Sequence, residues 1–180
     1  MKKLDQKFKQ NPVTDTDASS LIKLIKFCYE EYKNQGVIFD IQEETELLKP
    51  ASHFAAHNGK LLGIRSSFDP ESLVAVCGFT QSEPRLSGTR KMEFKKLYVS
   101  HDYRGHGLAQ YLVNEVIKEA RHRNIAELFL WTDSRFTKAH QLYKKLGFIK
   151  QNKTRKLSDK SNSEEFCYCL HIKSTKVSMT

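Results

Sequence analysis

The 180-residue sequence predicts a mixed α/β domain of α+β-like character, in which a twisted mixed sheet of six to seven strands is flanked by about four helices. Three observations support this fold class. Apolar residues recur at helical spacing in several separate segments, and short apolar runs alternate with these segments. Within one strand the apolar alternation changes phase, which is typical of a β-bulge. At this length one domain, 1–180, can bury a sizeable core, with a frayed tail at 173–180.

The first half of the chain is expected to hold two helices and a hairpin. An amphipathic helix is predicted over 17–33, because its apolar residues follow helical spacing: Leu21, Leu24, Ile25, Cys28 and Tyr32. Residues 41–48 suggest a second short helix, which Pro50 would stop. The Asn-Gly pair at 58–59 lies between HFAAH and KLLGI and indicates a two-residue hairpin. After an Asp-Pro turn at 69–70, LVAVCGFT reads as a buried strand.

The phase change follows a loop at 81–90. Met92 and Phe94 share one phase of the alternation, whereas Leu97 and Val99 share the other. A bulge between them would separate the strand from its neighbour and free backbone groups near 97–99. Two separate short strands, or plain irregularity, would give the same pattern.

The second half continues the alternation of helix and strand. An apolar stripe of Ala109, Leu112, Val113, Val116, Ile117 and Ala120 marks the clearest helix of the chain. Gly147 is expected to end the later helix as its C′ residue. The predicted elements are a helix at 107–123, a strand at 125–131, a helix at 136–146, a strand at 148–151, a polar loop at 152–163 and a strand at 165–172.

The composition favours a cytoplasmic protein. The chain has no apolar run near the roughly 18 residues that span a bilayer, and its N-terminus lacks a secretory signal, so no membrane partner is expected. Four cysteines do not make a disulfide framework, and Cys167 and Cys169 share a strand face rather than forming a metal knuckle. His53 and His57, on a predicted strand, have no third ligand nearby, so no metal is expected. Trp131, on a predicted buried strand, is assigned to the core in preference to the lining of a cleft.

The net charge is +9, and the excess is uneven. Residues 138–160 contain eight Lys or Arg and one acid, Asp159. This stretch either forms a solvated basic face or attracts an anionic ligand. It lacks the interleaved aromatics of a single-strand nucleic-acid platform.

The segment MEFKKLYVSHDYRGHGLAQ, 92–110, predicts a diphosphate site. It reads as a strand, a turn and a helix N-terminus, where free amides and the helix dipole favour an anion. Gly105 and Gly107 let the backbone approach the oxygens. A dinucleotide fingerprint would need a third glycine where Gln110 stands, and no G-x-x-x-x-G-K-[ST] occurs.

Two sequence motifs match a known family. Arg104, Gly107 and Ala109 fit the signature Q/R-x-x-G-x-G/A, the preceding strand ends in LYV, and AHQLYKKLGF at 139–148 matches A-x-x-L-Y-x-x-x-G-F. Together they resemble the GCN5-related N-acetyltransferase superfamily, most strongly over 90–150. The resemblance implies acetyl-CoA as co-substrate, without a metal, and a primary amine of a small molecule or peptide as acceptor.

The resemblance also implies a set of coenzyme contacts. The backbone of Leu97, Tyr98 and Val99 would pair with the pantetheine arm, and Tyr143 would lie near the sulfur. Many members carry an asparagine at the position of Phe136, so its contact is expected to be either lost or taken over by Ser134 or Thr132. The pyrophosphate would be held by backbone amides of Arg104, Gly105, His106, Gly107, Leu108, Ala109 and Gln110.

Three residues are candidates for catalysis. Glu93 matches the general base of some family members, the Val99 N–H is a candidate oxyanion donor, and Tyr143 would protonate the leaving thiolate. Glu93 could instead be a strand carboxylate that balances the charge of nearby lysines. Tyr143 could instead be a tyrosine that packs on the apolar side of its helix. His140 is expected to have a helix-capping role or to lie at the surface.

Two other functions stay open. A catalytically degenerate member would bind acyl-CoA as a regulatory module, and a basic module would bind nucleic acid. A homodimer is also compatible with the sequence. Among acceptors, the basic excess favours those that carry an acidic group over polyamines.

Overall fold

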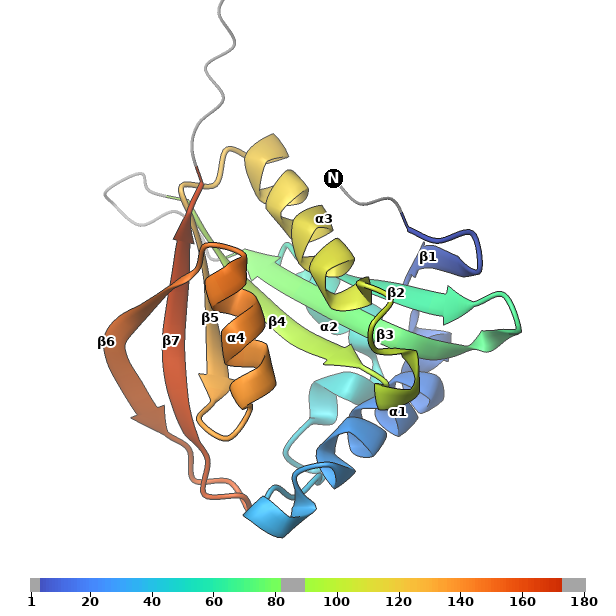
Figure 1. The fold of residues 1–180 in the computed structure, drawn as a ribbon, viewed down its shortest axis with the longest axis horizontal. Coiled ribbons are helices and arrows are strands. Elements are labelled where there is room, and N and C mark those ends of the chain that lie inside the picture. Colours follow the sequence, from blue (N-terminus) through green and yellow to red (C-terminus); the bar gives the residue numbers. More distant parts are fainter. Residues whose placement is uncertain (1–3, 82–89, 173–180) are drawn as a thin grey trace, which may run out of the picture.

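A computed structural model describes residues 4–81 and 90–172, and these form one seven-stranded mixed sheet with four α-helices (Figure 1). The sheet order is β1-β2-β3-β4-β5-β7-β6, and only the β4–β5 pair is parallel. The predicted fold class is therefore confirmed. The strands are β1 (Phe8–Pro12), β2 (Lys60–Ser66), β3 (Asp69–Gln81), β4 (Lys91–Val99), β5 (Glu127–Asp133), β6 (Ile149–Lys156) and β7 (Glu164–His171). The helices are α1 (Ala18–Glu30), α2 (Pro50–Ala56), α3 (Leu108–His122) and α4 (Thr137–Lys145).

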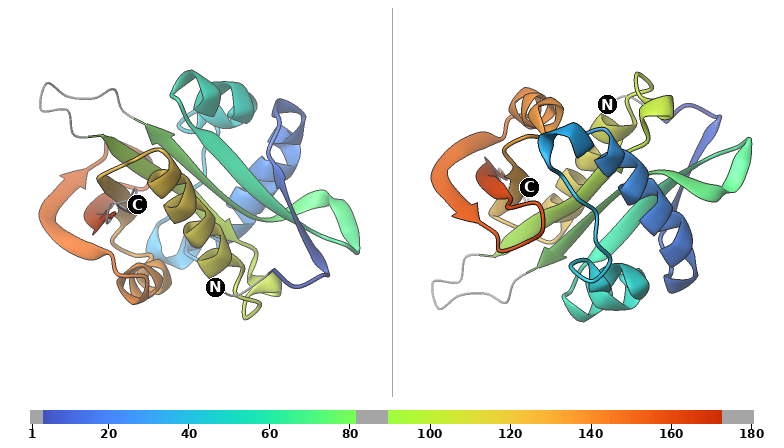
Figure 2. Two further views of the ribbon diagram at one scale, coloured as in Figure 1. Left: turned by 90° about the horizontal axis from the view of Figure 1, so that it is seen from above. Right: turned by 90° about the horizontal axis from the view of Figure 1, so that it is seen from below.

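The sheet carries a hydrophobic core on each face (Figure 2). On one face α3 and Tyr143 of α4 pack against the sheet, with Leu112, Val116 and Phe94 fully buried or nearly so. On the other face α1 and α2 contribute Leu21, Ile25 and Phe54. The predicted apolar stripes of α1 and α3 thus face the sheet, as their helical spacing requires.

The segment before β2 differs from the prediction. Pro50 was predicted to stop a helix, but it is the first residue of α2. Proline is tolerated there because an N–H at the first helical position would have no acceptor within the helix. His53 and His57 therefore lie one turn apart at this helix, not on a strand. The helix expected at 41–48 is a short 3₁₀ helix, η3 (Thr45–Leu48).

The predicted hairpin at 58–59 is wrong because the residues before it form helix α2 and not a strand. Asn58 adopts a left-handed φ of 51° and Gly59 N–H donates to the Phe54 carbonyl (2.8 Å), so this pair joins α2 to β2. Gly59 is required there, since a Cβ would lie 2.1 Å from the Phe79 carbonyl oxygen. The true hairpin joins β2 to β3 further on, and Asp69 and Pro70 already belong to β3.

The predicted β-bulge is confirmed in β4. The register against β3 shifts between the pairs Val76–Tyr98 and Gly78–Lys95, and Lys96 at the shift has a left-handed φ of 56°. On its other side β4 pairs with β5 only from Lys91 to Glu93. The two central strands therefore separate for the last six residues of β4.

The C-terminal half follows the prediction except at β6. This strand extends to Lys156, so the first five residues of the predicted 152–163 loop are strand. The rest of that loop is anchored, because the Arg135 guanidinium donates to the Ser161 carbonyl (3.1 Å) and the Ile38 N–H donates to Ser161 Oγ (2.8 Å). Gly147 ends α4 with a φ of 89°, as expected.

Two predictions fall outside the described residues: most of the loop at 81–90, and the tail at 173–180. Within the described ranges, no helix combines the length and apolar character that crossing a membrane requires.

Candidate functional site

The separation of β4 from β5 exposes the edge of β4 beyond the bulge. Ser100 N–H donates to the Val74 carbonyl of β3 (2.9 Å). Successive amides of an extended strand point to opposite sides, so the Val99 N–H is directed away from β3 and toward the opening. The Val99 backbone also contacts the Cys28 thiol, whose pKa burial raises to about 12.

A cavity of about 470 Å³ lies at this edge, and we call it the turn cavity. It is bounded by the exposed edge of β4, the turn before α3, and α4. Among the predicted coenzyme contacts, those that line it are Leu97, Tyr98, Val99, Arg104, Gly105, Gly107, Leu108, Ala109 and Gln110.

The turn at the cavity has the geometry of an anion cradle. Gly105 and Gly107 have φ values of 81° and 76°, which an L side chain rarely adopts. Leu108, Ala109 and Gln110 form the first turn of α3, where a helix leaves its amides without intrahelical acceptors. These donors and the helix dipole both favour a negative group.

The Arg104 side chain fixes this turn to α1. Its guanidinium donates to both oxygens of Glu31, at 3.0 and 2.5 Å, and Lys138 of α4 approaches the same carboxylate at 2.6 Å. The hydrogen bond from Arg104 is the largest cause that lowers the pKa of Glu31, to about 2. Glu31 therefore joins α1, the turn and α4.

A second cavity of about 340 Å³ is lined by Glu93 to Tyr98 of β4 and by Trp131 to Asp133 of β5, and we call it the acidic cavity. It shares five lining residues with the turn cavity: Tyr29, Leu97, Tyr98, Phe136 and Ala139. The two cavities are therefore contiguous at the bulge.

The structure brings Glu93 and Tyr143 together in the lining of the acidic cavity. Glu93 lies 3.5 Å from the Lys95 ammonium, and its side chain is 21% exposed. Tyr143 is buried with its ring edge-on to Phe94, and burial raises the pKa of its phenol. The phenol is thus neutral and able to donate a proton.

Lys96, at the bulge, is a buried cation that the sequence analysis did not identify. Its ammonium lies 2.9 Å from Glu46 and also binds Glu44, both from the segment before α2. Burial alone would lower the pKa of Lys96, but the two carboxylates outweigh burial and raise it. The Tyr29 hydroxyl donates to Glu44 and lies 3.3 Å from the Tyr98 hydroxyl. The phase slip in β4 was the only sequence signal for this network.

Trp131 was also misassigned, since it lines the acidic cavity rather than the core. The Arg155 guanidinium lies over its ring, 4.5 Å from the centroid, and binds Glu165 at 2.5 Å. Arg155 belongs to the part of β6 that was predicted to be a loop, which explains why this pairing was missed.

Several predicted site residues lie elsewhere. His106 and Ser134 line neither cavity: the His106 ring packs on Phe8 (5.4 Å between centroids), and the Ser134 N–H donates to the Glu164 carbonyl (2.8 Å). His140 is held by the Asp133 carbonyl at 2.9 Å.

Phe136 and Thr132 do reach the site. Phe136 lines both cavities and packs on Tyr32 (4.7 Å between centroids), so an apolar wall stands where many family members have an asparagine. Thr132 lines the acidic cavity only.

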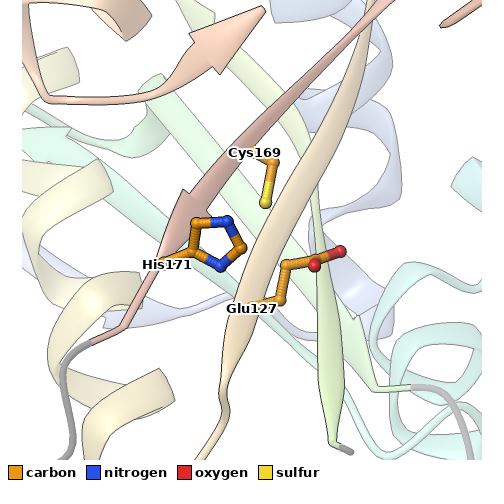
Figure 3. A group of neighbouring side chains, drawn as sticks. All are labelled: Glu127, Cys169 and His171. Carbon is orange, nitrogen blue, oxygen red and sulfur yellow. The ribbon is translucent and has the colours of Figure 1, made fainter. Parts of the chain in front are cut away.

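One group of potential metal ligands lies apart from both cavities. Ligand atoms of Glu127, Cys169 and His171 fall within 4.8 Å of one another, on β5 and β7 (Figure 3). Lys91 already pairs with Glu127 at 2.7 Å, and burial raises the pKa of the Cys169 thiol to about 11. None of these three residues lines either cavity.

The comparisons with known proteins agree on one fold. The family described as Acetyltransferase (GNAT) family matches residues 18–148 of the chain. A GNAT-family acetyltransferase from Staphylococcus aureus Mu50 has a TM-score of 0.75 at 16% identity, covering 92% of this chain and 99% of that one. YncA from Salmonella typhimurium, solved with its cofactor acetyl-CoA, has a TM-score of 0.70 at 12% identity, covering 93% and 95%. The PaiA N-acetyltransferase of Thermoplasma acidophilum, in complex with coenzyme A, has a TM-score of 0.67 at 16% identity, covering 91% and 98%.

Proposed function

Because the chain belongs to the GNAT acetyltransferase family, we propose that it transfers an acetyl group from acetyl-CoA to a primary amine by direct attack of the amine. The observation that carries this proposal is the divergence of β4 from β5, which leaves the β4 edge facing the turn cavity beside a helix N-terminus. Similar structures from Salmonella typhimurium and Thermoplasma acidophilum contain acetyl-CoA or coenzyme A.

The residues of the turn cavity fit acetyl-CoA. Its charged lining residues are Arg104, Lys138 and Lys145, and none of the described residues that line it is acidic. These cations and the first-turn amides of α3 suit the phosphates. The exposed backbone of Leu97 and Val99 suits an extended amide-containing arm, which it can bind as a strand binds a strand.

When bound, acetyl-CoA supplies an acetyl group activated as a thioester. The residues around the acidic cavity then have to prepare the amine. An alkyl amine with a pKa near 10.4 is only about 0.04% neutral at pH 7. We assign Glu93 as the base that takes the amine proton, because it lines the acidic cavity where that cavity meets β4.

Two further groups complete the proposed mechanism. The Val99 N–H, which is directed away from β3, would donate to the negative oxygen that develops during the attack, a contribution of roughly 10²–10³ in rate. Tyr143 would give its phenolic proton to the departing thiolate. Burial keeps that phenol protonated at neutral pH.

Two measurements test this function. Acetyl-CoA should raise the melting temperature of the protein, since a ligand that binds the native state stabilises it. A screen of amines should then detect release of coenzyme A. Absence of a thermal shift contradicts acetyl-CoA binding, whereas a shift without release for any amine supports the regulatory module instead.

A further inference from the structure

We propose that the acidic cavity selects small aliphatic acceptors that carry a second positive charge besides the amine that is acetylated, such as diamines and polyamines. This inference rests on the proposed function and deepens it.

The charge of the acidic cavity is opposite to that of the chain. Among the residues that the structure describes, eight carboxylates line it, and three cations, Lys95, Lys96 and Arg155, lie among them. Arg135 and Lys160, which pair with two of the carboxylates from outside the lining, bring the cations to five. Three negative charges remain in excess within a chain of net charge +9.

Two cations of the chain show how residues that line the acidic cavity interact with a positive group. Arg155 lies between the Trp131 ring and the Glu165 carboxylate, and Lys96 lies between two glutamates. An aromatic face beside a carboxylate is a favourable environment for a cation. These positions are already filled by side chains, so they illustrate the chemistry without being the binding positions themselves.

Two carboxylates of the cavity are left without such a partner. Glu43 accepts the Lys160 backbone N–H (2.9 Å) and Asp159 accepts the Ser163 backbone N–H (2.8 Å). Among the described residues neither forms an ion pair within 4 Å. Lys160 and Arg135 act on them over a longer distance, but these two cations already pair with Asp40 and Asp133. They lie on the 38–43 and 159–163 segments, which hydrogen bonds through Ser161 join into one wall.

The chemistry of the reaction then favours an acceptor with a second cation. The reacting amine must lose its proton before it attacks, so it cannot neutralise carboxylates while it reacts. Glu93 would take that proton at the β4 side of the cavity. A group of the acceptor that stays positive can still interact with Glu43 and Asp159 during the reaction.

The size and apolar parts of the cavity fit a short aliphatic chain. Its volume is about 340 Å³, and Val37, Ile38, Phe136 and Leu157 offer apolar surface along its lining. Methylene groups can pack on such surface while the charged ends meet the carboxylates. The net charge of the whole chain favoured acceptors with an acidic group, but that charge gathers at the turn cavity and on β6.

Three ligands with the same four-carbon stem test this inference: 1,4-diaminobutane, butylamine and 4-aminobutyrate. Each is titrated calorimetrically into the protein saturated with coenzyme A. The diamine should bind at least about tenfold more tightly than butylamine, with 4-aminobutyrate weakest, and added salt should reduce the difference. A diamine that binds no more tightly than butylamine overturns the inference.

Variants test which residues cause the preference for the diamine over butylamine. The double variant Glu43→Gln, Asp159→Asn should lose most of the preference for the diamine over butylamine. The matched control is Glu71→Gln, an exposed glutamate at the start of β3 that lines neither cavity, and it should keep the full preference. Glu43→Gln alone, at an exposed position, serves if the double variant does not fold. An unchanged preference in these variants contradicts the inference.

A separate assay distinguishes the two proposals. Tight diamine binding without release of coenzyme A from acetyl-CoA would overturn the proposed transfer but keep the ligand class. Equal kcat/KM for butylamine and the diamine would overturn the ligand class but keep the transfer. A lysine peptide that reacts faster than spermidine would overturn the restriction to small acceptors.

Discussion

The ammonium of Lys96 lies 2.9 Å from the carboxylate of Glu46, and this pair ties the bulge of β4 to η3. Lys96 holds a left-handed φ of 56° and its side chain is only 12% exposed. A buried pair at a strained backbone position shows that the bulge is fixed by side-chain charge as well as by the strand register.

Replacing Lys96 with methionine should therefore destabilise the fold. Lys96→Met keeps the stem and the backbone conformation but leaves Glu44 and Glu46 without their cation, so the free energy of unfolding should fall by about 3 kcal/mol. Urea unfolding measures this loss. Lys95→Met, at a more exposed neighbour, should cost less than about 1 kcal/mol. A Lys96→Met protein as stable as Lys95→Met would show that the pair does not fix the bulge.

Substitution of Glu93 tests its assignment as the base. Glu93→Gln should lower kcat by roughly 10²–10⁴ at pH 7, with acetyl-CoA still raising the melting temperature. The loss should shrink as the pH approaches the pKa of the amine, because neutral amine then forms without the base. Steady-state release of coenzyme A against pH measures both effects, with Glu71→Gln as the control. A loss that is the same at all pH values would argue for a structural role.

Substitution of Tyr143 separates its hydroxyl from its packing. Tyr143→Phe keeps the ring beside Phe94 and Phe148, so the melting temperature should hardly change. Loss of the proton donor should lower kcat by at least about 10²-fold, and the KM for acetyl-CoA should stay the same. Unchanged kcat would leave Tyr143 with a packing role alone.

Glycine substitutions test the anion cradle. Gly105 has a φ of 81°, and an added Cβ would meet no heavy atom within 4 Å. Gly105→Ala should therefore cost only about 1–2 kcal/mol of backbone strain, but it should raise the KM for acetyl-CoA several-fold. Gly36, with a φ of 77° and similar space, is the control, since Gly36→Ala should cost similar stability without affecting that KM. Equal KM values for the two variants would rule out the cradle.

The Glu31 carboxylate predicts an acid-dependent loss of stability. Its pKa is lowered from 4.5 to about 2 by Arg104 and Lys138, so its contribution is complete above pH 4.5 and disappears as the pH falls toward 2. The side chains are partly exposed, so the effect should stay below about 1 kcal/mol. Unfolding of the native protein and of Glu31→Gln, compared across this range, should show a difference that vanishes at the acid end. A difference that persists at pH 2 would contradict the assigned pairing.

The sequence predicted best where a pattern is long or has a single cause. The stripe of α3 runs over four turns, and the slip between Phe94 and Leu97 is the pattern that a bulge produces. Both were predicted correctly. The turn at Gly105 and Gly107 was located by residue type, because only glycine adopts those φ values readily.

The failures have physical reasons too. The seven-residue α2 buries only Pro50 and Phe54, which is too little for helical periodicity to be visible. β6 is exposed along almost its whole length, so its polar residues read as a loop. The acidic cavity collects carboxylates from five separate parts of the chain, and the total charge of +9 conceals them.

The position of β6 at the end of the sheet order has a consequence for self-association. An outermost strand has one side of its backbone unpaired and can recruit another strand. β6 carries four cations, Lys150, Lys153, Arg155 and Lys156, and no acid. Two copies that met along this strand would bring like charges together across the new ladder. The cations of β6 thus disfavour pairing of two copies of this protein along this edge of the sheet.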